Sequence, residues 1–260
     1  MARILITGSS DGLGQLAAKR LIANGHSVVL HARNASRAND TTKACPGAET
    51  VLIADLSSLS ETKRMADEVN KLGAFDCIIH NAGLYRGPAR MTQDGIPALA
   101  VVNTLAPYVL TSLITRPKRI VFLSSEMHQS GSSKNLDDAL WVSRGEKPYS
   151  EGTAYCDSKL HNVMFAKAFA RRWNDVQVNA LDPGWVATKM GGSSAPDDPE
   201  ASVQSYVMLA EGQEKLAKTT GRYFGPGKVL EKESPVSYDE QKQERLLDLL
   251  AAFSGVKKPE

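Results

Sequence analysis

The chain has 260 residues, and 31 Lys and Arg against 29 Asp and Glu leave a net charge of +2 at pH 7. This length suffices for one large α/β domain, and the balanced, scattered charge argues against partners such as nucleic acid or a membrane surface. The three cysteines lack metal-ligand spacing, so no metal site is expected and a reducing compartment is favoured. The sequence opens directly into an apolar segment and contains no run of membrane-spanning length, so we expect a cytoplasmic protein.

Short apolar runs alternate with helical patterns along the chain. Runs that are apolar on both faces are typical of parallel strands covered by helices on both sides; they are Arg3–Ile6, Ser27–Leu30, Val51–Ala54, Phe75–Ile79, Arg119–Leu123 and Val176–Leu181. The helical patterns are Leu13–Ala23, Leu59–Leu72, Ile96–Leu113, Ala154–Trp173 and Tyr238–Phe253, the last with Ser237 as its N-cap. The alternation predicts a single α/β domain over residues 1–260 with a doubly wound, mostly parallel sheet.

A glycine-rich segment, Gly8-Ser9-Ser10-Asp11-Gly12-Leu13-Gly14, joins the first predicted strand to the first predicted helix. Glycines there permit a tight turn, and the free amides of the helix N-terminus favour a phosphate. The spacing is G-x-x-x-G-x-G, which differs from the commonest dinucleotide fingerprint. We interpret it as a pyrophosphate loop, with a purely structural turn as the alternative.

The residue after the second predicted strand indicates which dinucleotide is bound. An acidic residue there is typical of NAD enzymes because it binds the ribose 2′-hydroxyl. Here the position holds Arg33, and a guanidinium suits a 2′-phosphate. The sequence therefore predicts NADP, with NAD as the alternative cofactor, although Asp11 in the phosphate loop does nothing to favour the extra phosphate.

Tyr155 and Lys159 lie four residues apart in a helical pattern and should project from the same face. A nearby ammonium should lower the pKa of the phenol and make Tyr155 a proton donor and acceptor near neutral pH. Alone, this spacing also fits a solvated helix face. His128 and His161 are further acid/base candidates, but Tyr155 already fills that role.

Taken together, these motifs resemble the short-chain dehydrogenase/reductase family from Ile4 to about Phe224. The matching positions, in order, are Thr7-Gly8 through Gly14, Asp55-Leu56, Asn81-Ala82-Gly83, Asn103, Ser124-Ser125, Tyr155 with Lys159, and Pro183-Gly184. The strings Tyr155–Asn162 and Asp182–Thr188, and Leu136-Asp137-Asp138 with Trp141, are similar to the retinol-dehydrogenase-like branch. The resemblance implies a Rossmann fold with a seven-stranded sheet.

The resemblance also implies a role for each matching residue. Tyr155 would exchange the proton of a carbonyl/alcohol pair, Lys159 would lower its pKa and hold the nicotinamide ribose, and Ser125 would hold the substrate oxygen. Asn103 would position a water that links Lys159 to solvent, or would only repair a helix backbone. The expected cofactor-binding residues are Gly8, Ser10, Asp11, Gly12, Leu13, Gly14, Arg33, Asp55, Leu56, Asn81, Ala82, Gly83, Tyr155, Lys159, Pro183, Gly184, Val186 and Thr188.

The leading hypothesis is an NADP-dependent oxidoreductase that interconverts a carbonyl and an alcohol, with an apolar small-molecule substrate. The alternatives are an NADP-binding regulator without turnover and a reductase of carbon–carbon double bonds on the same fold. Segments 127–152 and 185–221 should lie on the substrate side, with 191–199 a mobile loop. In many members of the family, the helices that match those with Asn103 and Tyr155 form the dimer interface. Here the helix that carries Asn103 is short, which leaves a homodimer open as an assembly.

Overall fold

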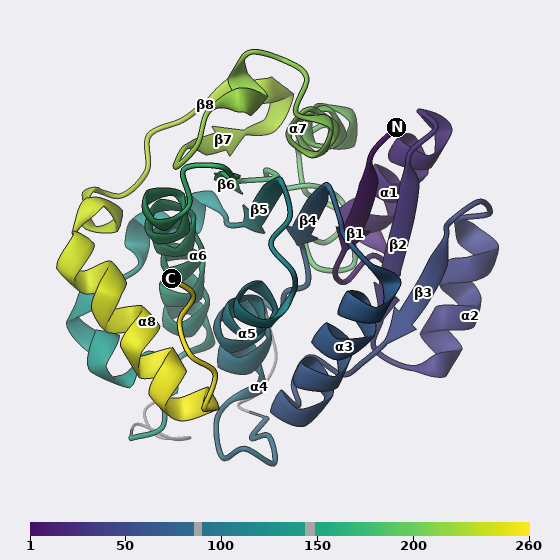
Figure 1. Cartoon of the computed structure of the whole chain (residues 1–260). Helices are drawn as coiled ribbons and strands as arrows, with labels where there is room; N and C mark the ends of the chain where they lie inside the picture. Colours follow the sequence, from purple (N-terminus) through teal and green to yellow (C-terminus); the bar gives the residue numbers. More distant parts are fainter. Residues whose placement is uncertain (86–89, 144–148) are drawn as a thin grey trace.

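An eight-stranded sheet runs through the molecule, with helices on both faces (Figure 1). The computed structural model describes residues 1–85, 90–143 and 149–260. The strands are β1 Arg3–Ile6, β2 Ser27–Ala32, β3 Thr50–Ile53, β4 Cys77–His80, β5 Arg119–Leu123, β6 Gln177–Leu181, β7 Tyr223–Gly225 and β8 Val229–Leu230. Their order across the sheet is β3-β2-β1-β4-β5-β6-β7-β8.

The predicted doubly wound, mostly parallel sheet is confirmed. The prediction of seven strands is wrong, since the described residues form eight. The additional strand, β8, pairs with β7 as a two-residue antiparallel edge strand. The chain builds outward from β1 to β3 and then returns to place β4 on the other side of β1. Ligands bind in the crevice that such a reversal leaves at the carboxyl ends of the strands.

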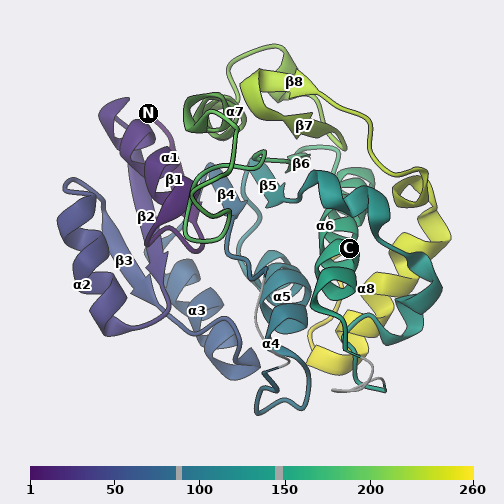
Figure 2. The ribbon, with the colours of Figure 1, turned by 180° about the vertical axis from the view of Figure 1, so that it is seen from behind.

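The helices are α1 Gly12–Ala23, α2 Ala35–Ala44, α3 Leu59–Leu72, α4 Ala98–Ala100, α5 Ala106–Leu113, α6 Glu151–Arg172, α7 Pro199–Glu211 and α8 Glu240–Ser254. Alternate side chains of β1 enter different cores because strand side chains alternate between faces. Ile4 and Ile6 pack with Leu21 of α1, whereas Leu5 packs with Met65 of α3. The layer with α1 and α7 and the layer with α3, α5 and α6 lie on opposite sides of the sheet (Figures 1 and 2).

Several helical predictions need correction. The single helix predicted over Ile96–Leu113 is interrupted by a π-helical turn, Val101–Leu105, between α4 and α5. Helix α2 was not predicted, because its sequence is polar and offers little apolar periodicity. The last helix begins two residues later than predicted, and its N-cap is Asp239, whose carboxylate accepts from the Lys242 amide, rather than Ser237.

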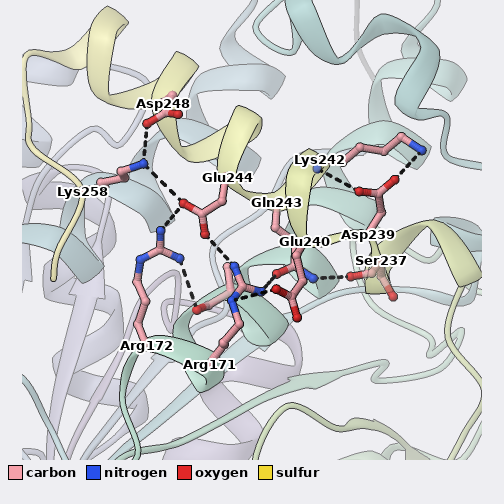
Figure 3. Close-up of polar contacts among 11 residues, drawn as sticks. Arg171, Arg172, Ser237, Asp239, Glu240, Lys242, Gln243, Glu244, Asp248 and Lys258 are labelled. Atoms are coloured by element: carbon pink, nitrogen blue, oxygen red, sulfur yellow. Dashed lines mark hydrogen bonds and ion pairs between the residues drawn. The ribbon is translucent and has the colours of Figure 1, made fainter.

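Helix α8 packs against α6 and is fixed there by a network of charged groups (Figure 3). Glu244 accepts from both Arg171 and Arg172 of α6, and Lys258 lies 3.3 Å from its Oε2 atom. Beneath these groups, Leu246, Leu247 and Leu250 are fully buried. The C-terminal segment thereby covers the outer side of the helix that carries Tyr155.

Candidate functional site

The glycine-rich segment forms a turn at the carboxyl end of β1, as predicted. Gly8 has φ +63°, and a Cβ atom there would lie 2.7 Å from the Cα atom of Ala82, so the turn needs glycine to approach the end of β4. Thr7 Oγ1 accepts from the amides of Asn81 and Ala82 and joins the same two strand ends. The amides at the start of α1 then face the carboxyl edge of the sheet, where they suit an anion.

His31, at the end of β2, fixes this turn and was not predicted to do so. Its Nδ1 atom accepts from the Gly8 amide at 2.9 Å, and its Nε2 atom donates to the Ala54 oxygen at 2.9 Å. The imidazole therefore joins the ends of β1, β2 and β3 in its neutral form. Burial lowers its pKa below the usual 6.5 and favours that form.

Two cations pair with Asp11 of the glycine-rich segment. Arg37 Nη1 lies 2.9 Å and Lys189 Nζ 3.4 Å from Asp11 Oδ2, and Arg33 lines the same cavity. The carboxylate that seemed unfavourable for a 2′-phosphate is thus already paired with positive charge. Sequence reasoning missed Arg37, which lies in the first turn of α2, a helix that was not predicted.

The predicted cofactor residues mostly surround one cavity of about 310 Å³. Those that line it are Gly8, Ser10, Asp11, Gly12, Leu13, Gly14, Arg33, Asp55, Leu56, Asn81, Ala82, Gly83, Tyr155, Lys159, Pro183 and Thr188. Gly184, Val186 and Ser125 instead line a second cavity of about 730 Å³, and Asn103 lines neither. Unpredicted lining residues of the first cavity include His31, Arg37, Lys189, Met190 and Tyr206.

The two cavities share a wall that includes Tyr155; the residues that line both are Leu13, Ser124, Tyr155, Pro183, Thr188 and Met190. Tyr155 is 8 % exposed, and its ring packs at a tilt against Tyr85 with 4.5 Å between centroids. Burial raises its pKa, and a hydrogen bond with Ser125 opposes that rise only in part. The expected lowering by Lys159 is therefore wrong for the protein alone: the phenol stays protonated, as a proton donor must be.

Lys159 projects from α6 one turn after Tyr155, as predicted, into a buried position. Its Nζ atom lies 5.3 Å from the centroid of the Tyr155 ring and donates to the Leu123 oxygen at 3.0 Å. Burial lowers its pKa from 10.5 to about 8. The amino group of Lys159 therefore lies beside the phenol with a pKa close to physiological pH.

The two serines at the end of β5 point to different places. Ser124 is buried and lines both cavities, but its hydroxyl donates to the Lys159 oxygen at 2.9 Å. Ser125 is half-buried and lines the larger cavity, and its hydroxyl oxygen accepts from the Met127 amide at 3.3 Å. Ser125 is accordingly the serine that can reach a ligand beside the phenol.

Asn103 lies in the π-helical turn and is buried behind the cavities. Its side chain accepts from the Leu84 amide at 2.7 Å and donates to the Leu84 oxygen at 2.8 Å. Its own main-chain oxygen accepts from Asn162 of α6 at 3.0 Å. These bonds of Asn103 fix the chain leaving β4 next to Tyr85, and the predicted link to Lys159 through water stays a prediction.

The larger cavity has a mostly apolar wall that is interrupted by polar and charged groups. Its apolar wall consists of Leu13, Tyr85, Met127, Pro183, Trp185, Val186, Met190 and Pro226. Among its other residues are Glu126, His128, Gln129, Asp182, Tyr223, Glu231 and Lys232. Across the described ranges, no helix has the length and apolarity to cross a bilayer, and no group of His, Cys, Asp and Glu is placed to hold a metal ion.

Comparisons with known proteins agree with this arrangement. The family model for short chain dehydrogenases matches residues 2–135. The chain is 46% identical to the short-chain dehydrogenase chyC of Penicillium rubens over the full length of both, and 31% identical to human retinol dehydrogenase 13, covering 98% of this chain and 85% of that one. A crystal structure of an uncharacterised Mycobacterium paratuberculosis protein has 27% identity and a TM-score of 0.83, covering 100% of this chain and 96% of that chain.

Proposed function

Because the chain belongs to the short-chain dehydrogenase/reductase family of NAD(P)-dependent oxidoreductases, we propose that it reduces a carbonyl to an alcohol, and catalyses the reverse reaction, with NADP as its cofactor and Tyr155 as the general acid and base. The observation that carries this proposal is the position of Tyr155 at the junction of the two cavities. A group bound there can meet a cofactor on one side and a substrate on the other.

The residues of the smaller cavity fit a dinucleotide. The Gly8 turn and the start of α1 offer amides for a pyrophosphate, and Asp55 offers a carboxylate for the adenine amino group. Arg33 and Arg37 would hold a 2′-phosphate, which supports NADP over NAD. Bound NADPH supplies the hydride to the substrate carbon.

The proton path follows from the side chains around the junction. Ser125 would donate a hydrogen bond to the carbonyl oxygen, and Tyr155 would transfer its phenolic proton to that oxygen as the carbon accepts the hydride. The product is then a neutral alcohol, and the phenolate left on Tyr155 is stabilised by the nearby Lys159 ammonium. Proton uptake from solvent restores the phenol.

Segments 127–152 and 185–221 would select the substrate, since Met127, Gln129, Trp185 and Met190 line the larger cavity. Its carboxylates and hydroxyls favour a substrate that carries hydrogen-bonding groups beside its apolar part, in place of a purely apolar one. Such a compound can satisfy the polar groups of the wall as it displaces water.

The test is NADPH and NADH oxidation with a panel of aldehydes, ketones and enones, followed by product identification. The proposal expects alcohol products and a higher kcat/KM with NADPH. Saturated ketone products from enones would indicate a double-bond reductase instead. Tight NADP binding without turnover of any compound would indicate a regulatory protein and contradict the proposal.

A further inference from the structure

His128 is a fully buried imidazole in the 3₁₀ helix Glu126–Ser130, directly after Ser125. Its Nδ1 atom lies 2.7 Å from the Ser125 oxygen, and its Nε2 atom lies 3.0 Å from the amide nitrogen of Ser234. Because an amide can only donate, Nε2 must accept and Nδ1 must carry the proton. Burial lowers the pKa of His128 and favours this neutral form.

The two residues that His128 joins lie in different segments: Ser125 lines the larger cavity, and Ser234 lies next to a segment that lines it. Ser125 lines the cavity, as Tyr155 does, and its hydroxyl oxygen accepts from the Met127 amide at 3.3 Å. Ser234 follows Glu231 and Lys232, which also line the cavity, and Gln129 Nε2 donates to the Lys232 oxygen at 2.7 Å. One imidazole therefore connects the serine beside the phenol to the chain that forms another wall.

The turn that carries His128 is fixed on its other side to α6, the helix of Tyr155. A Cβ atom on Gly131 would lie 2.7 Å from the Cys156 oxygen, so this approach requires glycine. The Ser132 amide donates to Asp157 Oδ1 at 2.8 Å. The turn is held against α6, and the two ring bonds of His128 join Ser125 to the 231–234 segment, while the His128 amide also donates to the Ser125 oxygen at 2.9 Å.

We propose that His128 is a positioning residue with two separable effects: its bond to Ser125 sets kcat, and its bond to Ser234 sets KM for the carbonyl substrate. The inference rests on the proposed function. The Ser125 bond restrains the backbone that aims the serine hydroxyl, and a misplaced hydroxyl weakens the stabilisation of the reacting oxygen. The Ser234 bond restrains a wall that contacts substrate away from the reacting carbon, where contacts act on binding.

Two substitutions at His128 separate the bonds. His128→Asn keeps a donor near the position of Nδ1 and is too short to reach Ser234; we expect KM for the substrate to rise about tenfold and kcat to change less than about threefold. His128→Gln can still accept from Ser234 but loses the donor to Ser125; we expect kcat to fall about tenfold or more with KM nearly unchanged.

Ser234→Pro provides a second test that does not substitute His128. Ser234 has φ −54°, which proline adopts, so the change keeps that dihedral, removes the amide donor and places Cδ where the imidazole now accepts, which separates Nε2 from residue 234. It should reproduce the KM effect of His128→Asn, whereas Ser234→Ala, which keeps the N–H group, should behave like the wild type. The dissociation constant for NADP⁺ should stay the same in all variants, since neither residue lines the cofactor cavity.

Equal changes in kcat and KM across these variants, or a Ser234→Pro enzyme identical to Ser234→Ala, would overturn the assignment of His128. Failure of the proposed function gives a different result, because the wild-type chain itself would then reduce no carbonyl. If the wild type reduces a carbonyl but the variants do not separate kcat from KM, the proposed role of His128 is wrong and the proposed function stands.

Discussion

The Lys159 ammonium donates to the main-chain oxygen of Leu123 at 3.0 Å, deep in the protein where it is 5 % exposed. One neutral carbonyl compensates little of the hydration that the charge has lost. The lowered pKa of about 8 is the consequence. Lys159 is therefore held at a cost to stability, in the place where the proposed function needs a cation.

Lys159→Met should accordingly stabilise the protein while abolishing activity. Each pKa unit corresponds to about 1.4 kcal/mol. A pKa of about 8 in place of 10.5 therefore lowers the free energy of unfolding at neutral pH by up to about 3 kcal/mol. Because the unfolded chain binds more protons than the folded one between these values, wild-type stability should rise from about pH 8 to 10.5. Urea unfolding of both proteins across that range measures the effect; a variant less stable than the wild type at pH 7 would contradict it.

Arg33 and Arg37 should determine the preference for NADP. Arg33→Glu and Arg37→Gln should each lower the ratio of kcat/KM for NADPH over NADH, by about tenfold or more, because each removes a cation from the expected 2′-phosphate site. Asp11→Asn is the matched control, since it removes the partner of Arg37 and leaves both guanidinium groups. An unchanged ratio in Arg33→Glu would exclude Arg33 from phosphate recognition.

Asn103→Asp should destabilise the chain next to Tyr85. The substitution replaces the amide that donates to the Leu84 oxygen and leaves two oxygens facing each other in a buried site. The expected loss of unfolding free energy is about 2–4 kcal/mol at pH 7. Thermal unfolding measures it, with Asn162→Asp as a comparison at the neighbouring buried amide. A change below about 0.5 kcal/mol would show that Asn103 does not hold this segment.

Glu244 should make the attachment of α8 sensitive to acid. Burial acts to raise its pKa, but the bonds and charges of Arg172, Lys258 and Arg171 outweigh burial and hold the pKa at about 2. A carboxyl group with a lowered pKa stabilises the fold above the unfolded value near 4.5, and this contribution is lost as the pH falls towards 2. Glu244→Gln should therefore lower the Tm at pH 7 but not near pH 2; an equal loss of Tm at both values would refute the ion-pair explanation.

The sequence was most informative where local chemistry determines local structure. Apolar runs identified the strands from β1 to β6 to within one or two residues at most ends, and the glycine-rich segment identified the turn that Gly8 makes possible. Helix α2 was not predicted because its sequence is polar and has no helical spacing of apolar residues. Strand β8 was not predicted because two residues are too few to show an alternating pattern. The π-helical turn around Asn103 depends on bonds to Leu84 and Asn162, which no local pattern contains.

The sequence predicted which residues lie together at the candidate site better than it predicted their pKa values. Tyr155 and Lys159 lie together as their spacing indicated, but burial dominates both pKa values, and burial depends on the packing of the whole chain. Arg37 and His31 contribute to the cofactor cavity through tertiary contacts with Asp11 and Gly8. A cytoplasmic location and a homodimer stay predictions, although α8 packs on α6, one helix expected at a dimer interface.

The most direct test of the proton-transfer role is kcat/KM for NADPH-dependent reduction of a carbonyl substrate by Tyr155→Phe. This variant keeps the ring that packs against Tyr85 and removes only the hydroxyl. If Tyr155 delivers the proton, kcat/KM should fall about 10²-fold or more, while the dissociation constant for NADPH stays within about threefold of the wild-type value. Turnover by Tyr155→Phe at close to the wild-type rate would contradict the role of Tyr155.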